Sequence, residues 1–151
     1  MTGLTIAERP FFEGMAPAHL DILEAVADRV SFPSGTTIFR EGGEATVWYL
    51  VTDGVVTLEI DVPGRGPHIL QTLHEGDVLG WSWLFPPYRW SFDAYARTDI
   101  EAIAFDAGRL RAAKQDDASL GYALMQRFAQ VLVRRMQAAR LQLLDIYGTP
   151  R

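Results

Sequence analysis

Hydrophobic and polar positions divide the chain into a helical segment, a series of short strands and a second helical segment. Near the N-terminus, Leu20, Leu23 and Val26 recur at helical spacing after Pro17, a residue suited to the first turn of a helix. Residues 32–35, Phe-Pro-Ser-Gly, break this pattern. The sequence therefore predicts a short N-terminal helix.

Short β-rich runs separated by turn residues follow this helix. Asp53-Gly54 between two apolar runs predicts a β-hairpin, and residues 63–67, Pro-Gly-Arg-Gly-Pro, predict a second, longer turn. No helices alternate with the strands, which argues against a parallel α/β architecture. Regularly spaced short strands are typical of a closed roll or a sandwich. The predicted strands are residues 36–40, 47–52, 55–61, 69–73, 93–97 and 101–105.

The last third of the chain predicts a short helix over residues 106–114 and a long helix over residues 117–146 that begins at an Asp or Ser cap. One apolar stripe of the long helix is suited to packing on the strands and comprises Leu120, Leu124, Phe128 and Val131. A second stripe alternates spacings of four and three, which is the pattern of a left-handed coiled coil. This seam comprises Met125, Ala129, Leu132, Met136, Ala139, Leu143 and Ile146.

A helix with one stripe for its own domain and a second stripe left over predicts a homodimer, because pairing buries both. The alternative is an unusually broad intramolecular face that includes Met125 and Met136. Basic residues also gather in this part of the chain. From Gln126 onward the only acid is Asp145, and the basic residues are Arg127, Arg134, Arg135, Arg140 and Arg151. They either meet an acidic partner or solvate the outer face of the helix.

Composition narrows the class of protein. A length of 151 residues suits a single domain, with the helix, strands and short helix in residues 11–116 and the long helix in residues 117–147. Without cysteines, the chain has no disulfides, thiolate metal sites or cysteine nucleophiles. A net charge of -5 argues against a general nucleic-acid binder. No signal peptide or membrane span is evident, so we expect a cytoplasmic protein without membrane contact.

The segment from Leu73 to Ala96 carries the candidate chemistry. After Gly80, residues 81–85 predict one helical turn whose free N–H groups face an anion, with Arg89 as the positive charge beside it. The alternative is a hydrophobic plug of Trp81, Trp83 and Trp90, with Arg89 paired to a nearby carboxylate.

An enzyme is not expected from the remaining polar residues. His68, His74 and Glu75 invite comparison with the metal site of a cupin, but two strand residues six apart lie about 20 Å from each other. Ser82 and Ser91 lack a plausible relay of His and Asp. Metal catalysis of the cupin type therefore remains the least favoured alternative.

Several strings resemble the cyclic-nucleotide-binding domain of the catabolite activator (Crp/Fnr-like) family of bacterial regulators. Residues 32–42 are similar to the entry strand of that domain, residues 49–56 to its central hairpin, and residues 73–80 to the lead-in of its phosphate-binding cassette. The resemblance covers roughly residues 11–146. It implies a mainly β fold, a β-roll of the jelly-roll or double-stranded β-helix type, flanked by an N-terminal helix and a long dimerisation helix.

The cassette departs from the family pattern where the ligand is read. Trp81 stands where the family has the glutamate that takes the ribose hydroxyl, and Trp90 stands where it has the phosphate-binding arginine. Arg89 matches that arginine only with a slip of one residue; Ser91 agrees with the pattern, and Phe92 replaces a small pocket residue. Losing a buried polar contact costs about 1–3 kcal/mol. We therefore expect no binding of cyclic AMP in the usual way.

The expected ligand is a cyclic nucleotide or another small anion, and no other cofactor is implied. The candidate anion contacts are Gly80, Ser82, Arg89 and Ser91, and the candidate wall or plug comprises Trp81, Trp83, Trp90 and Phe92. No recognition helix follows the long helix before Arg151, so we expect no direct DNA binding. The chain is expected to be a stand-alone sensor that acts on a separate protein partner, or a ligand-free adaptor that pairs with one.

Overall fold

The structure is a computed structural model that describes residues 6–147, with side chains described as far as Leu141. The predicted seam residues Leu143 and Ile146 therefore lie outside the described side chains, as do Asp145 and Arg151. In chain order the elements are η1 (Pro10–Phe12), α1 (Pro17–Ala25), β1 (Ala27–Phe32), β2 (Thr37–Phe39), β3 (Val47–Asp53), β4 (Val56–Val62), β5 (Gly66–Leu73), β6 (Val78–Leu79), η2 (Ser82–Leu84), β7 (Asp93–Ala96), β8 (Ile100–Asp106), α2 (Ala107–Asp116) and α3 (Ala118–Tyr147).

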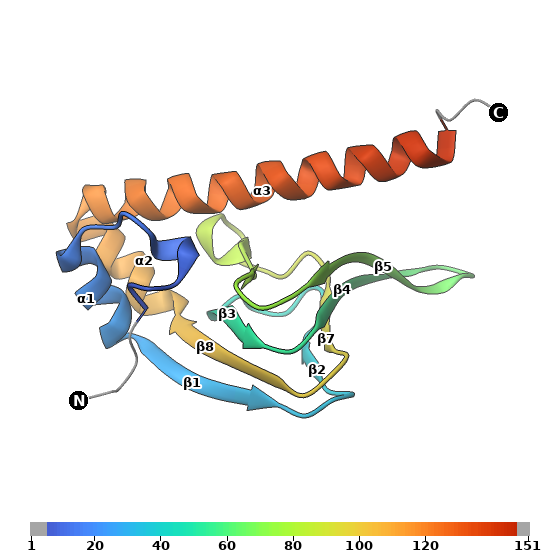
Figure 1. The fold of residues 1–151 in the computed structure, drawn as a ribbon, viewed down its shortest axis with the longest axis horizontal. Coiled ribbons are helices and arrows are strands. Elements are labelled where there is room, and N and C mark those ends of the chain that lie inside the picture. The colour runs from blue at the N-terminus through green and yellow to red at the C-terminus, as the bar shows by residue number, and fades with distance from the viewer. Residues whose placement is uncertain (1–5, 148–151) are drawn as a thin grey trace.

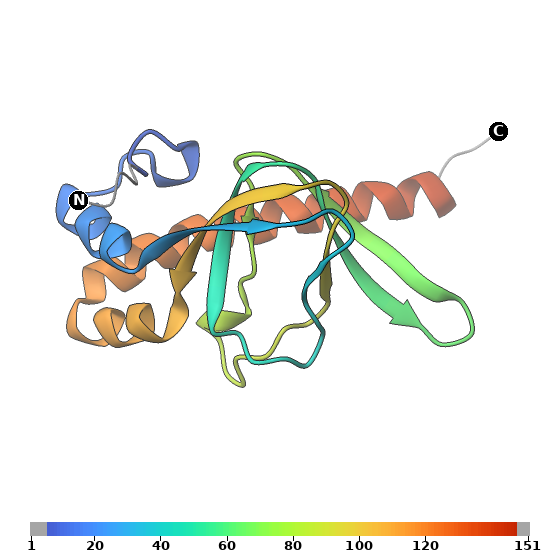
Figure 2. The same ribbon diagram turned by 90° about the horizontal axis from the view of Figure 1, so that it is seen from below.

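The strands of residues 6–147 form two antiparallel four-stranded sheets, in the orders β1-β8-β3-β6 and β2-β7-β4-β5. They enclose a β-roll, from which the hairpin of β4 and β5 projects (Figure 2). Helix α3 runs along one side of the roll, and α1 and α2 gather at its N-terminal end (Figure 1). The predicted β-roll with flanking helices is confirmed. None of the described helices is long and apolar enough to cross a lipid bilayer.

Two groups of buried side chains hold these layers together. One lies where the helices meet the roll and is centred on Trp48, which stacks against Phe105 and meets Phe128 of α3 edge to face. The other lies inside the roll and includes Leu58, Phe92 and Ile100. The predicted inner stripe of α3 is confirmed, because all four of its members are buried: Leu120, Leu124, Phe128 and Val131.

The expected hairpin at Asp53-Gly54 is wrong. Strand β3 pairs with β6 and β8, whereas β4 pairs with β5 and β7, so this turn carries the chain from one sheet to the other. Gly54 has a φ of +104°, and a Cβ there would lie 2.4 Å from the carbonyl oxygen of Asp99. Glycine is needed for this close approach and not for a two-residue hairpin. The longer turn does form a hairpin, in which Val62 pairs with Gly66.

Two strands were missed because their sequences lack a clear alternation of apolar residues. Strand β1 lies at the edge of its sheet with Asp28 and Arg29 exposed, and β6 is only two residues long. The helix boundaries were better predicted, because capping is local. The Asp106 carboxylate accepts a hydrogen bond from the backbone N–H of Arg109 at the start of α2, and Asp117 caps α3.

Candidate functional site

The turn at Gly80 is filled by an aromatic side chain of the protein itself. Gly80 has a φ of +98°, and a Cβ on it would lie 2.6 Å from Cζ3 of Trp90. Trp90 is 5% exposed, and its ring stacks on that of Phe39 with 3.9 Å between the ring centroids. The absence of a side chain at Gly80 therefore accommodates an indole that lies against the backbone.

Arg89 is engaged elsewhere. Its guanidinium donates a hydrogen bond of 2.9 Å to the carbonyl oxygen of Gly42, and its backbone forms a β-bridge with Glu44. The side chain is exposed and lines a shallow pocket with Tyr88 and Arg111. The expected pairing with a carboxylate is thus replaced by a backbone carbonyl. The nearby carboxylate of Asp93 instead accepts a hydrogen bond from the backbone N–H of Glu41.

The predicted helical turn after Gly80 is present as the 3₁₀ helix η2. Ser82 and Trp83 are buried within it, and Trp83 stacks against Trp48 in the core between the roll and the helices. Ser91 is exposed. Only Trp81 and Phe92 of the eight predicted ligand residues line the large cleft of this domain, with 4.9 Å between their ring centroids. Ligand contact by all eight residues remains a prediction.

That cleft lies between the β4–β5 hairpin and α3, which run beside each other in Figure 1. We call it the roll–helix cleft. Its volume is about 630 Å³, within the range of about 300–1,000 Å³ typical of small-molecule sites. It is lined by Leu58, His68, Ile69, Leu70, Gln71, Thr72, Trp81, Phe92, Leu132, Arg135, Met136, Ala138 and Ala139.

Arg135 brings a positive charge to this cleft. Its Nη2 donates to the carbonyl oxygen of Val78, and its guanidinium carbon lies 5.3 Å from the centre of the Trp81 ring. Its Nη1 is buried and has no hydrogen-bond partner within the described residues. Burial lowers the pKa of Arg135 to about 10, while the nearby Asp77 acts in the opposite direction. The group therefore remains charged at neutral pH.

Sequence reasoning missed Arg135 as a site residue, although a signal was present. The inner stripe of α3 passes through Phe128 and Val131, and its next position, four residues on, is Arg135. The expectation that the arginines of this helix all solvate its outer face is wrong for two of them. Arg127 also turns inward, and donates to the carbonyl oxygens of Phe11, Ala123 and Glu13.

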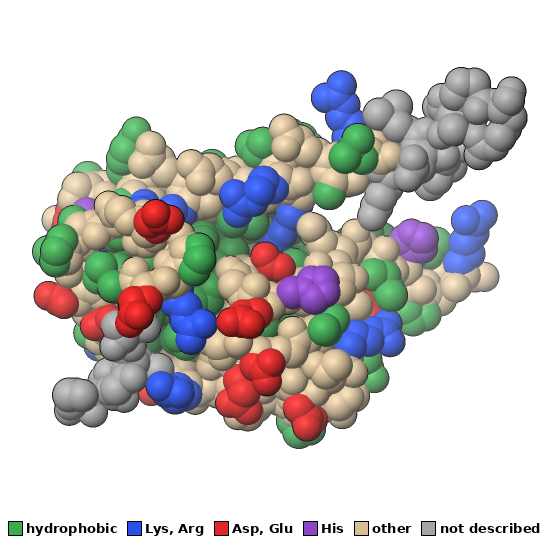
Figure 3. Space-filling model, in the orientation of Figure 1, with side chains coloured by type: hydrophobic (Ala, Val, Ile, Leu, Met, Phe, Trp, Pro, Cys, Tyr) green, Lys and Arg blue, Asp and Glu red, His purple; other side chains and the backbone are tan. Residues whose placement is uncertain are grey.

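Arg134 and Arg140 are exposed, as expected. Basic side chains lie along α3 in the face shown in Figure 3, while acidic side chains gather on the roll below it. The outward-facing part of the basic stripe therefore remains available to an acidic partner.

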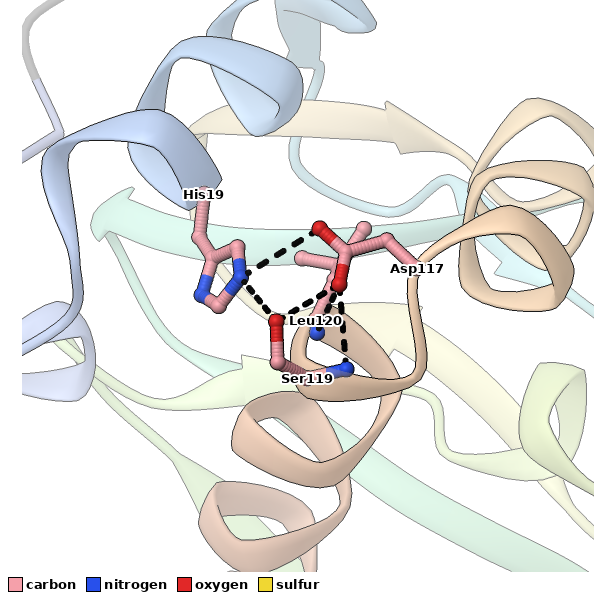
Figure 4. Close-up of polar contacts among 4 residues, drawn as sticks. All are labelled: His19, Asp117, Ser119 and Leu120. Carbon is pink, nitrogen blue, oxygen red and sulfur yellow. Dashed lines mark hydrogen bonds and ion pairs between the residues drawn. The ribbon is translucent and has the colours of Figure 1, made fainter.

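A Ser-His-Asp group lies at the start of α3, remote in sequence from the cassette (Figure 4). His19 Nε2 lies 3.0 Å from Ser119 Oγ and 3.6 Å from an oxygen of Asp117. In a catalytic relay the carboxylate holds the opposite ring nitrogen, whereas His19 Nδ1 is buried without a partner among the described residues. Hydrogen bonds from Ser119 and Leu120 lower the pKa of Asp117. The group docks α1 on the capped first turn of α3.

The three residues considered for a cupin-like metal site are not arranged as one. His68, His74 and Glu75 are exposed on β5 and the turn after it. Among the side chains that the structure describes, those of residues 6–141, no three of His, Cys, Asp or Glu are grouped so that they could hold a metal ion.

The roll, the turn at Gly80 and the cleft beside the long helix have the layout of a known family. Residues 29–117 match the family model described as the cyclic nucleotide-binding domain. The chain belongs to this family. The match begins within β1, ends just after α2, and so includes nearly the whole roll.

Similar proteins include bacterial regulators of this family. The chain is 26% identical over 144 residues to the CRP-like cAMP-activated global transcriptional regulator of Mycobacterium tuberculosis, covering 95% of this chain and 62% of that protein. The crystal structure of the Thermus thermophilus catabolite activator protein matches with a TM-score of 0.70 and 28% identity, covering 89% of this chain and 61% of that chain.

A cyclic nucleotide-binding domain from Methylobacillus flagellatus shares the fold, with a TM-score of 0.79 and 16% identity over 96% of this chain and 82% of that chain. The chain spans less than two thirds of the length of the curated relatives it matches. The activities in the relatives' names therefore describe those proteins, and for this chain they are proposals.

Proposed function

We propose that this domain is a non-enzymatic regulatory sensor that binds a small ligand in the roll–helix cleft and does not bind cyclic AMP in the usual way. The observation that carries the proposal is the contrast between a filled turn and an open cleft. Trp90 packs on Gly80, where the resemblance places phosphate recognition. The cleft nearby keeps about 630 Å³ of space, with the charge of Arg135 beside it.

Titration calorimetry with cyclic AMP and cyclic GMP tests the claim that the domain does not bind a cyclic nucleotide in the usual way. A phosphate close to Gly80 has to displace the Trp90–Phe39 stack, so neither nucleotide is expected to bind at micromolar concentration. Micromolar binding of either nucleotide that is abolished by Arg89→Ala would show that the cassette works in the usual way.

The uncharged apolar fluorophore N-phenyl-1-naphthylamine tests the claim that the roll–helix cleft binds a small ligand. We expect its fluorescence to rise with wild-type protein and not with Ala138→Trp, because the indole would occupy the cleft that Ala138 lines. Gln137→Trp is the matched control, since Gln137 is exposed and is not among the residues that line the cleft. Equal fluorescence with the two variants, or no rise with wild type, would remove the cleft as a binding site.

We further propose that the domain pairs through α3. Met136 is 65% exposed and Met125 is 37% exposed, as a helix with an unburied second stripe requires. Leu132, Met136 and Ala139 of the predicted seam also line the cleft, so ligand and partner helix would share one side of α3. Signals from the cleft would then pass to the pairing surface.

Light scattering on Met136→Glu tests this pairing. The charge is expected to convert a dimer into a monomer, because it places a carboxylate in an apolar seam. Val133→Glu is the control, because Val133 is exposed but lies outside the seam. A wild-type protein that remains monomeric at high micromolar concentration would contradict the proposal.

A ligand-free adaptor is the second candidate, favoured by the filled turn at Gly80 alone. The two functions differ in what stabilises the domain. A sensor melts at a temperature that rises with ligand concentration, whereas an adaptor responds to its partner protein.

A further inference from the structure

Arg135 has bonding capacity that the protein leaves unused. Its Nη2 binds one neutral carbonyl oxygen, that of Val78, and its Nη1 is buried without a partner in the described part of the chain. The guanidinium lies over the Trp81 ring at the wall of the roll–helix cleft. A buried donor without a partner costs free energy, so such a group points to a partner that the protein does not itself supply.

We propose that Arg135 is the anion receptor of the roll–helix cleft, and that the ligand is a small apolar carboxylate whose flat body packs between Trp81, Phe92 and α3. This inference rests on the proposed function and adds the chemical class of the ligand. The anionic group is placed on α3 instead of the cassette turn, where Trp90 occupies the space beside Gly80.

Charge complementarity selects an anion. None of the described residues that line the cleft is Asp or Glu. The acid that acts on Arg135 is Asp77, which lines a neighbouring, smaller pocket of about 290 Å³ that Arg134 and Arg135 also line. One oxygen of Asp77 accepts a hydrogen bond of 2.8 Å from the backbone N–H of His74. An anion that approaches through the roll–helix cleft therefore meets the charge of Arg135 from the side on which the described lining carries no acidic side chain.

The strength of the bonds also favours a carboxylate. Hydrogen bonds between two charged groups are roughly twice as strong as neutral ones, and a guanidinium matches a carboxylate with two parallel N–H donors. Binding would move Arg135 from the Val78 carbonyl toward the ligand. Burial, which lowers the pKa of Arg135, would be offset by the charge of the ligand.

The rest of the lining selects an apolar body. The Phe92 ring is buried and tilted at 59° to that of Trp81, and the two form one wall. Leu132 and Met136 of α3 and Leu58 of β4 add aliphatic side chains to the lining. Rings and aliphatic chains gain free energy by leaving water at such a surface, roughly 25 cal/mol per Å² of apolar area.

Calorimetry with 1-naphthaleneacetate and its uncharged isostere 1-naphthaleneacetamide tests the inference. The carboxylate is expected to bind wild-type protein roughly ten- to hundredfold more tightly than the amide, the range for a hydrogen bond to a charged group. Arg135→Gln should abolish this preference. Arg140→Gln, which removes the same charge from an exposed position of the same helix, should preserve it.

Each other outcome is informative. Equal binding of acid and amide would overturn the role of Arg135 and leave the cleft as a ligand site. Failure of both compounds would overturn the inference, and N-phenyl-1-naphthylamine then decides whether the proposed cleft function fails as well. Loss of binding as protein concentration rises into the dimer range would show that a second copy fills the cleft, which also overturns it. If Arg135→Gln does not fold, Arg135→Lys replaces it, and its preference should fall between wild type and none.

Discussion

The turn at Gly80 and the roll–helix cleft both use residues of one short segment, 80–92, and they are built in opposite ways. At the turn, Trp90 lies against the Gly80 backbone and stacks on Phe39, which leaves no room. At the cleft, Trp81 and Phe92 form a wall beside open space, and an arginine is left with an unused donor. Aromatic side chains of one segment therefore fill the space at one site and border open space at another.

Truncation of Trp90 and Trp81 is expected to give the largest difference in stability between the two sites. Trp90→Ala is expected to lower the free energy of unfolding by about 3–5 kcal/mol, because it empties a buried site. Trp81→Ala should cost about 1–2 kcal/mol, because Trp81 is only half-buried and loses its contacts with Phe92 and Arg135. Urea denaturation measures both. Equal losses of free energy of unfolding would mean that the turn and the cleft do not differ in how their tryptophans are packed.

The glycine beneath Trp90 gives the next largest effect. Gly80→Ala is expected to cost about 2–4 kcal/mol, since it adds a clash with the indole to the strain of a positive φ. Gly76→Ala is the matched control. It has a φ of +91° with no atom within 4 Å of its Cβ, so only about 1–2 kcal/mol is expected. Urea midpoints that coincide for the two variants would show that Trp90 does not rest on Gly80.

The two inward-facing arginines of α3 are expected to contribute unequally to stability. Arg127→Met should destabilise the fold by about 1.5–3 kcal/mol, because three carbonyl oxygens lose a charged donor. Arg135→Met should remain within about 1 kcal/mol of wild type, because it also removes a buried, unpaired donor and the Val78 carbonyl can be hydrated from the smaller pocket that Val78 lines. Thermal unfolding at pH 7 measures the difference. A larger loss at Arg135 would assign it a structural role.

The smallest effect is expected at the first turn of α3, away from both regions. Hydrogen bonds lower the pKa of Asp117 below 3.8 in the folded state, so its contribution is present above that pH and is lost as pH falls through the folded value. Asp117→Asn keeps the cap and removes the titration. Urea midpoints of wild type should therefore fall more than those of Asp117→Asn between pH 5 and pH 2.5. Parallel curves would contradict the assignment.

Local patterns predicted much of the fold and little of the site. Helix α3, its cap at Asp117 and its inner stripe follow from spacing along one element, and all three are confirmed. The turn at Asp53-Gly54 was misread, because a glycine with positive φ serves a hairpin or a change of sheet equally well. The partner of a strand is decided by residues far along the chain.

By itself, the sequence determined the periodicity of each element, the helix caps and the class of fold, because these depend on residues within a few positions of one another. Only the tertiary structure decided that Trp90 covers Gly80 by stacking on Phe39, about fifty residues away in the chain. The tertiary structure also placed Arg135 beside Trp81 at the wall of a cleft that no acidic side chain of the described lining shares. Burial and charge pairing at these points depend on neighbours from separate elements, and no local pattern records them.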